Sequence, residues 1–177
     1  MRMKFNPEQV YLVAKRIEEN GAAFYRRAAD FVDDPEKKKL LLSLADWEDR
    51  HLEFFESLRT DFRDVGPLEY KKYIDRVFKP DKETEASIFE WADSAILTPD
   101  ENPADHFTGD ETLEDILKIA LEMEKDAVVF YTGLKEAMNV TKESDAVSKI
   151  IKEEMRHISV LNRELAQCRM EDRKRGE

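Results

Sequence analysis

The chain has 177 residues, which suits one domain with a sizeable buried core. Its 40 acidic and 29 basic residues give a net charge of −11, which argues against a nucleic-acid binder, because phosphate contacts need a basic face. The single cysteine excludes an internal disulfide and a four-cysteine iron site. We find no apolar run long enough to span a membrane and no signal-peptide core, so we expect a soluble, cytoplasmic protein with no membrane partner.

Helix start and stop signals indicate a pair of long helices over residues 7–65. A proline in the first turn suits the start of a helix that runs to about Phe31. Asp34-Pro35 repeats this signal and begins a second helix, which Gly66-Pro67 ends. Because the connection between them is short, we expect the two helices to be antiparallel neighbours.

A crossover over residues 66–110 separates this pair from the rest of the chain. It carries two shorter helical patterns, at 68–78 and 84–97, followed by a loop with two prolines and a glycine. His106 lies in this loop without a helical partner, and we expect it on the surface.

A second pair of long helices is predicted over residues 111–171. Thr112 can form a capping box with Asp115 at the start of its first helix, and Thr141 can cap the last helix, which runs to about Met170. Two antiparallel pairs joined by a long crossover are typical of ferritin-like bundles. The sequence therefore predicts an all-α, antiparallel four-helix bundle that forms a single domain over residues 1–177.

Two tetrapeptides in these helix pairs share the pattern Glu-x-x-His. Glu48-Asp49-Arg50-His51 and Glu154-Met155-Arg156-His157 lie 106 residues apart, and the same offset carries Glu18 onto Glu124. One helix pair thus occurs twice, and each copy carries one glutamate followed by one Glu-x-x-His. At three residues apart, the glutamate and histidine of a tetrapeptide lie on one helix face.

The ionisable side chains of this repeat interrupt stripes whose other positions are nearly all apolar, small or aromatic. Glu164 in the fourth helix is the exception, and we expect it near an end of the bundle, with Leu165 in the core. In the second helix, Leu41, Leu44 and Phe55 surround Glu48 and His51 at helical spacing. Buried carboxylates cost several kcal/mol each, and neither Lys nor Arg lies on the four stripes to pair with them. Two divalent cations would balance four carboxylates; the alternative is a buried polar network without metal. The predicted metal ligands are Glu18, Glu48, His51, Glu124, Glu154 and His157.

The mixture of ligands favours particular metals. Oxygen-rich ligation with one imidazole per ion suits iron or manganese better than structural zinc. We therefore expect two iron ions, with manganese or a mixed pair as the alternative. Small residues flank the ligands of the first and third helices and would leave room for water, oxygen or peroxide: Ala14, Gly21, Ala120 and Ala127.

Three aromatic residues lie near the predicted ligands, and the two tyrosines among them have two possible roles. Tyr25 and Tyr131 each follow a proposed ligand by seven residues. We expect them to be core aromatics whose hydroxyl bonds a neighbour, with a role beside the metal or in electron transfer as the alternative. Trp47 adjoins Glu48 off the main stripe, and we expect it to serve in packing.

On these motifs, together with Phe24-Tyr25 and Phe130-Tyr131, the sequence resembles the rubrerythrin-like branch of the ferritin-like diiron proteins. The resemblance implies a carboxylate-bridged diiron centre at the six residues and redox chemistry with hydrogen peroxide or oxygen in oxidative-stress defence. Two features of the family are missing. The single cysteine leaves no rubredoxin domain, so an external electron donor such as rubredoxin is expected. The family's additional glutamate near the third-helix ligand is absent, since Leu121 and Ala127 flank Glu124.

Three functions stay open at this stage. The first is a rubrerythrin-like oxidoreductase, the second an iron-handling protein for ferroxidation or storage, and the third a helical interaction module that metal only stabilises. Bundles of this kind commonly dimerise, and we expect a homodimer. The sequence supports the site more strongly than it supports any one reaction.

Overall fold

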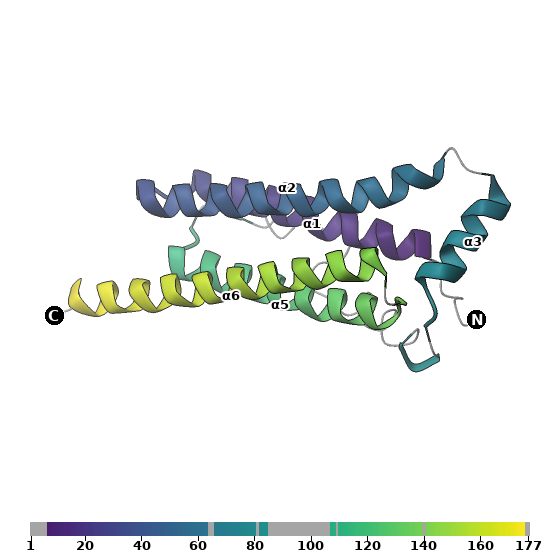
Figure 1. Cartoon of the computed structure of the whole chain (residues 1–177). Coiled ribbons are helices and arrows are strands. Elements are labelled where there is room, and N and C mark those ends of the chain that lie inside the picture. Colours follow the sequence, from purple (N-terminus) through teal and green to yellow (C-terminus); the bar gives the residue numbers. More distant parts are fainter. Residues whose placement is uncertain are drawn as a thin grey trace.

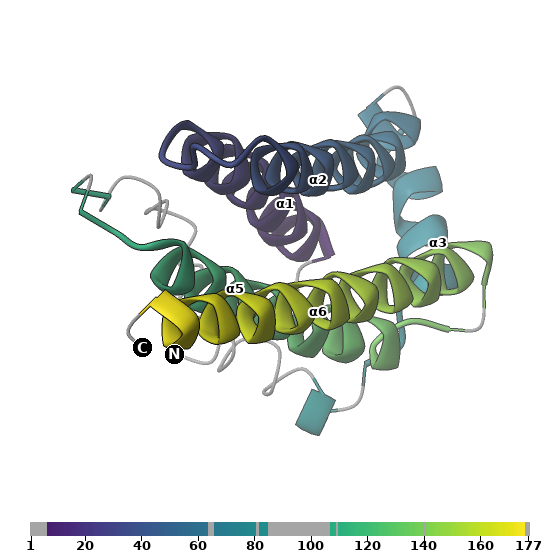
Figure 2. The ribbon, with the colours of Figure 1, turned by 90° about the vertical axis from the view of Figure 1, so that its left-hand side faces the viewer.

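The computed structural model describes residues 7–63, 66–80, 82–84, 107–108, 110–139 and 141–175. The helices whose bounds are defined are α1 (Pro7–Asp30), α2 (Pro35–Arg63), α3 (Pro67–Val77), α5 (Leu113–Glu136) and α6 (Lys142–Arg175). α1 packs mainly against α2, and α5 mainly against α6, so the long helices form two layers (Figures 1 and 2). The predicted all-α four-helix bundle of two helix pairs is therefore confirmed.

The predicted caps form at the helix starts. The Asp34 carboxylate accepts hydrogen bonds from the backbone of Glu36 and Lys37 at 2.9 and 3.1 Å, which satisfies two amides of the first turn of α2. Thr112 and Asp115 make a reciprocal capping box at the start of α5. These local bonds begin α2 and α5 where the sequence indicated.

Some helix ends differ from the prediction. α6 continues to Arg175, beyond the predicted end near Met170. Gly66 is the N-terminal cap of α3, with proline at its first position, so this dipeptide starts a helix as well as following one. His106, most of the second crossover pattern at 84–97 and most of the loop that follows it lie outside the described residues.

The crossover is attached to one end of the second helix pair. Lys79 N donates to Ala137 O at 3.0 Å, and Asn139 N donates to Val77 O at 2.6 Å. These two bonds hold the end of α3 beside the turn between α5 and α6, and Figure 1 shows α3 across that end of the bundle. The first part of the crossover thus closes the bundle at one end.

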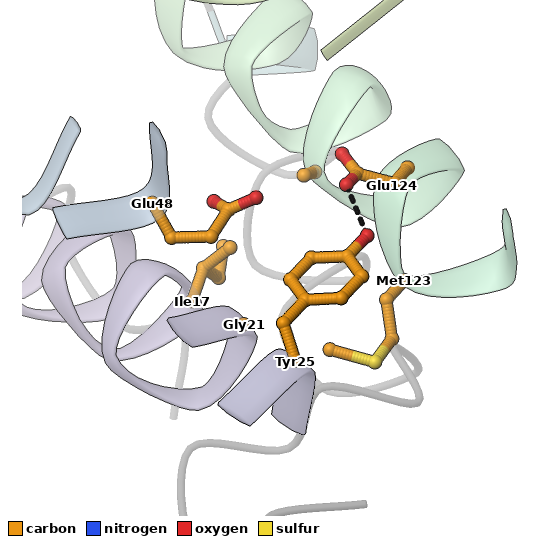
Figure 3. Close-up of a pocket in the computed structure, with 7 residues that line it drawn as sticks. Ile17, Gly21, Tyr25, Glu48, Met123 and Glu124 are labelled. Atoms are coloured by element: carbon orange, nitrogen blue, oxygen red, sulfur yellow. Dashed lines mark hydrogen bonds between the residues drawn. The ribbon is translucent and has the colours of Figure 1, made fainter. Parts of the chain in front are cut away.

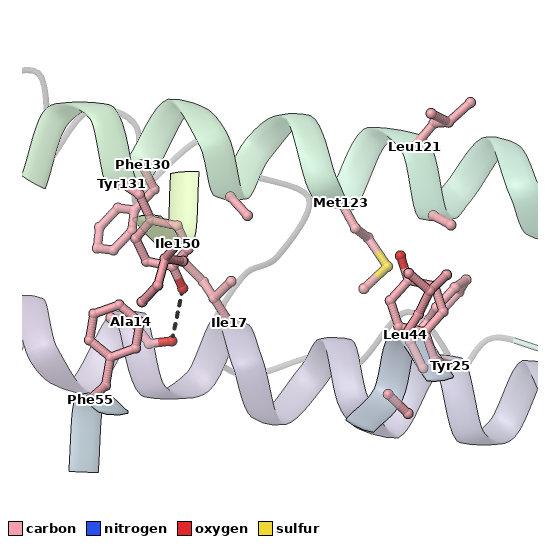
Figure 4. Close-up of a cluster of buried hydrophobic side chains, with 14 of the residues drawn as sticks. Ala14, Ile17, Tyr25, Leu44, Phe55, Leu121, Met123, Phe130, Tyr131 and Ile150 are labelled. Carbon is pink, nitrogen blue, oxygen red and sulfur yellow. Dashed lines mark hydrogen bonds between the residues drawn. The ribbon is translucent and has the colours of Figure 1, made fainter. Parts of the chain in front are cut away.

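The core lies between the two layers and runs along the bundle. Figure 4 shows two groups of buried side chains, one around Tyr131 and Phe55 and the other around Tyr25, Leu44 and Met123. The rings of Phe55 and Tyr131 stack at 5.3 Å between centroids. Within the described ranges, no helix combines the length and the apolar character needed to cross a membrane.

Candidate metal centre

All six predicted ligands are brought together between the layers. α1 supplies Glu18, α2 supplies Glu48 and His51, and α5 supplies Glu124, while Glu154 and His157 come from α6. Each of these side chains is buried, with at most 6% of its residue surface exposed. Four carboxyl groups and two imidazoles therefore share one interior site. Each layer contributes one glutamate and one Glu-x-x-His.

The six residues form two overlapping groups of four. One group is Glu18, Glu48, His51 and Glu154, and the other is Glu48, Glu124, Glu154 and His157. Within each group, one ligand atom per residue lies within 4.8 Å of the others. Glu48 and Glu154 belong to both groups, so each could bridge two ions, while the remaining glutamate and histidine of a group would serve one ion.

The donor atoms fit metal ions because their own hydrogen bonding is incomplete. Atoms without a hydrogen-bond partner include Glu18 Oε2, both oxygens of Glu154, and the Nδ1 atoms of His51 and His157. His51 Nδ1 is 2.9 Å from Glu154 Oε1, but the geometry there does not make a hydrogen bond. Each unpaired buried polar group costs about 1–3 kcal/mol, and bound divalent cations would remove this cost.

Without metal, the site favours protons. Burial raises the pKa of Glu124 to about 7, and repulsion from Glu154 acts in the same direction. Burial acts to lower the pKa of His157, but the carboxylates of Glu124 and Glu154 outweigh it and raise the pKa to about 10. The pKa of Glu48 is likewise raised by burial and by neighbouring carboxylates. Metal binding would therefore displace protons from these groups.

The two tyrosines bind the candidate ligands across the layers. Tyr25 of α1 donates its hydroxyl proton to Glu124 Oε1 at 2.5 Å (Figure 3), and Tyr131 of α5 donates to Glu18 Oε1. Both phenols are fully buried, and burial raises the pKa of each. The expected hydrogen bond to a neighbour is present in both cases, and the neighbour is a predicted ligand.

A small cavity of about 10 Å³ adjoins the centre. This volume holds about one water-sized molecule. Figure 3 shows its lining residues: Ile17, Gly21, Tyr25, Glu48, Met123, Glu124 and Ala127. A Cβ atom added at Gly21 would lie 3.2 Å from Glu48 Cγ, so glycine keeps this approach open. Ala14 and Ala120, which were also predicted to leave space, are buried but do not line the cavity.

Each imidazole has a neighbour outside the six ligands: Glu153, which sequence reasoning overlooked, and Trp47, which it assigned to packing. His51 Nε2 lies 2.9 Å from Glu153 Oε2, a hydrogen bond that leaves Nδ1 facing the other carboxylates. The ring of Trp47 meets that of His157 edge-on at 6.3 Å between centroids, and Trp47 is 36% exposed. Both residues directly precede the glutamate of a Glu-x-x-His, so the 106-residue offset pairs Glu153 with Trp47 and could have identified Glu153.

Comparison with known proteins supports the fold and the type of centre. No protein-family model and no curated protein matches the chain. A crystal structure from Thermotoga maritima, described as a candidate ferritin-like diiron-carboxylate protein, matches it with a TM-score of 0.64 and 25% sequence identity. The match covers 95% of this chain and 99% of the other. The chain therefore has the ferritin-like fold, with a buried carboxylate and histidine cluster that fits a diiron protein.

Proposed function

We propose that this protein is a diiron-carboxylate oxidoreductase whose reduced centre reacts with hydrogen peroxide or oxygen, in the manner of rubrerythrin-like proteins. The observation that carries the proposal is the set of six buried donors beside a cavity that holds about one water-sized molecule. A purely structural metal site would have no need of such a space. Two ferrous ions would supply the two electrons that reduce the oxygen–oxygen bond of peroxide.

The residues around the centre would have distinct roles. Glu18 with His51, and Glu124 with His157, would each hold one ion, and Glu48 and Glu154 would bridge the pair. Tyr25 and Tyr131 fix the outer glutamates through their hydroxyl groups, which keeps one oxygen of each carboxylate from rotating away. Ile17 and Met123 give the cavity apolar walls that limit the water beside the oxidant.

Several parts of this function stay predictions. Iron is proposed over manganese from the donor set, and a redox partner such as rubredoxin is proposed because the sequence has a single cysteine. The homodimer, the location in the cytoplasm and the role in oxidative-stress defence are proposed from the resemblance and the composition. Iron storage is the alternative, and it requires a shell-like assembly instead of a dimer.

A peroxide titration of the reduced protein tests the proposal. We expect anaerobically reconstituted ferrous protein to be oxidised by one equivalent of peroxide per pair of irons, followed by stopped-flow absorbance. The Glu154→Ala variant, with a shared ligand removed, is the matched control and should lose this fast phase. A fully loaded protein that peroxide and oxygen oxidise no faster than free ferrous iron would refute the oxidoreductase function.

A further inference from the structure

A second pocket lies between α2 and α6, and it is distinct from the cavity beside Gly21. Its volume is about 180 Å³, close to the roughly 150 Å³ of an apolar cavity that binds benzene. Apolar and polar side chains of both helices line it: Leu40, Ser43, Leu44, Trp47, Glu153, Arg156, His157 and Val160. The one carboxylate among them, Glu153, is engaged by His51 Nε2 at 2.9 Å. The pocket is therefore large enough for a ring-sized molecule and adjoins a predicted metal ligand.

The repeat shows that His157 lacks a carboxylate partner of the kind that His51 has. At His51, the Nε2 atom has a carboxylate partner in Glu153 at 2.9 Å. The equivalent position in the other helix pair holds Trp47, and no hydrogen bond joins His157 Nε2 to any residue in the described part of the chain. His157 Nδ1 faces the carboxylates of the centre, and the ring also lines the pocket. A carboxylate placed in the pocket would give His157 the partner that His51 already has.

Arg156 supplies the charge for such a ligand. It lies on the pocket wall, one residue before His157, and is exposed to solvent. No ion pair links its guanidinium to another residue within the described ranges, unlike Arg26 and Arg169 on the same bundle, which pair with Asp49 and Glu114. A charged hydrogen bond from an unpaired guanidinium is stronger than a neutral one and selects carboxylates by its planar geometry.

We propose that this pocket binds a small monocarboxylate with an apolar ring or branched chain. The ligand carboxylate accepts hydrogen bonds from His157 Nε2 and from Arg156, and its apolar part packs against Trp47, Leu44 and Val160. This site goes beyond the proposed redox reaction, since it concerns the face of His157 turned away from the centre. Binding can be measured whether or not the centre reacts with peroxide.

Calorimetric titration with benzoate tests the proposal, with benzyl alcohol as a neutral molecule of similar shape. We expect benzoate to bind at one site per chain, at least ten-fold more tightly than the alcohol, and to shift the nuclear magnetic resonance signal of His157 Nε2. Arg156→Gln should weaken benzoate binding about ten-fold, and Val160→Phe should abolish it by filling the pocket. Arg163→Gln makes the same charge change on α6 outside the pocket lining and should bind benzoate like the unmodified protein.

Several outcomes would overturn the site. The first is that benzoate binds no more tightly than benzyl alcohol. The second is that Arg156→Gln and Arg163→Gln weaken benzoate binding equally. The third is that a folded Val160→Phe variant still binds benzoate. A dimer that buries the pocket and excludes benzoate would also contradict it. Metal content and peroxide oxidation are measured on the same samples, so failure of the redox function and failure of this pocket are separate results.

Discussion

The two helix pairs carry the same donors in different surroundings. In both pairs, a glutamate of the first helix and a Glu-x-x-His of the second face the centre, and a tyrosine of one pair bonds the glutamate of the other. Around this shared set, Glu153 in one pair corresponds to Trp47 in the other. Gly21 likewise corresponds to Ala127. The ligands repeat, but the residues that orient and enclose them do not.

This difference separates the two candidate metal positions. A carboxylate bonded to the outer nitrogen of a histidine ligand fixes the ring and makes its other nitrogen a better donor. His51 has this support from Glu153, whereas His157 has the edge of an indole ring. We therefore expect the ion held by Glu18 and His51 to bind more tightly than the ion held by Glu124 and His157.

The largest expected effect concerns the shared glutamates. Glu154→Ala removes a donor from both groups and should reduce bound iron from two ions to none at micromolar ferrous iron. Glu124→Ala removes a donor from one group and should leave about one ion, held by the His51 group. Elemental analysis of desalted, reconstituted protein measures both. Equal metal loss in the two variants would contradict the division into shared and single-ion ligands.

The next effect tests the asymmetry directly. Glu153→Gln keeps the size of the side chain but removes its charge, and it should weaken the tighter of the two binding steps about 10- to 100-fold. Trp47→Phe, at the equivalent position, should change either step far less, because the indole meets the ring of His157 edge-on and the replacement keeps an aromatic ring there. Competition with a coloured chelator resolves the steps. If Glu153→Gln left the affinities of both binding steps unchanged, the hydrogen bond between Glu153 and His51 would not be the cause of a difference in affinity between the two metal positions.

A pH dependence follows from the raised pKa values in the metal-free protein. Burial holds the pKa of Glu124 near 7, above its usual 4.5, and the carboxylates hold that of His157 near 10, above 6.5. The folded state then binds more protons than the unfolded state, so its free energy of unfolding falls as pH rises through these ranges. Thermal melts with chelator should show a falling melting temperature from pH 5 to 9, while excess metal stabilises more at higher pH.

The opposite result for the metal-free protein, a melting temperature that rises steadily from pH 5 to 9, would mean that the cluster does not hold these protons. Melts of Glu124→Gln serve as the control, because an amide at this position cannot titrate. That variant should lose the part of the fall that lies between about pH 4.5 and 7.

The smallest effect concerns the cavity. Gly21→Ala places a methyl group about 3.2 Å from Glu48 Cγ and fills space for one small molecule. We expect two ions still to bind and oxidation by peroxide to slow several-fold. Ala127→Gly, the reciprocal change at the equivalent position, enlarges the same cavity and should not slow it. Stopped-flow rates at matched iron content decide between these outcomes.

The sequence predicted the bundle and the six clustered residues because both depend on local periodicity and on a repeat. A charged residue on an apolar stripe faces the core wherever the helix forms, so Glu18 and Glu124 could be identified without coordinates. Contacts across the layers could not be derived this way. The bonds from Tyr25 to Glu124 and from Glu153 to His51 depend on how two layers are rotated and shifted relative to each other. The pocket beside Arg156 depends on the same packing.

Metal content of the purified protein tests the central claim most directly. After anaerobic reconstitution with ferrous iron and removal of loose metal, we expect two ions per chain by elemental analysis. Anomalous scattering should place both among Glu18, Glu48, His51, Glu124, Glu154 and His157. A reconstituted, folded protein that retains far less than two ions per chain, or holds them elsewhere, would contradict the diiron centre.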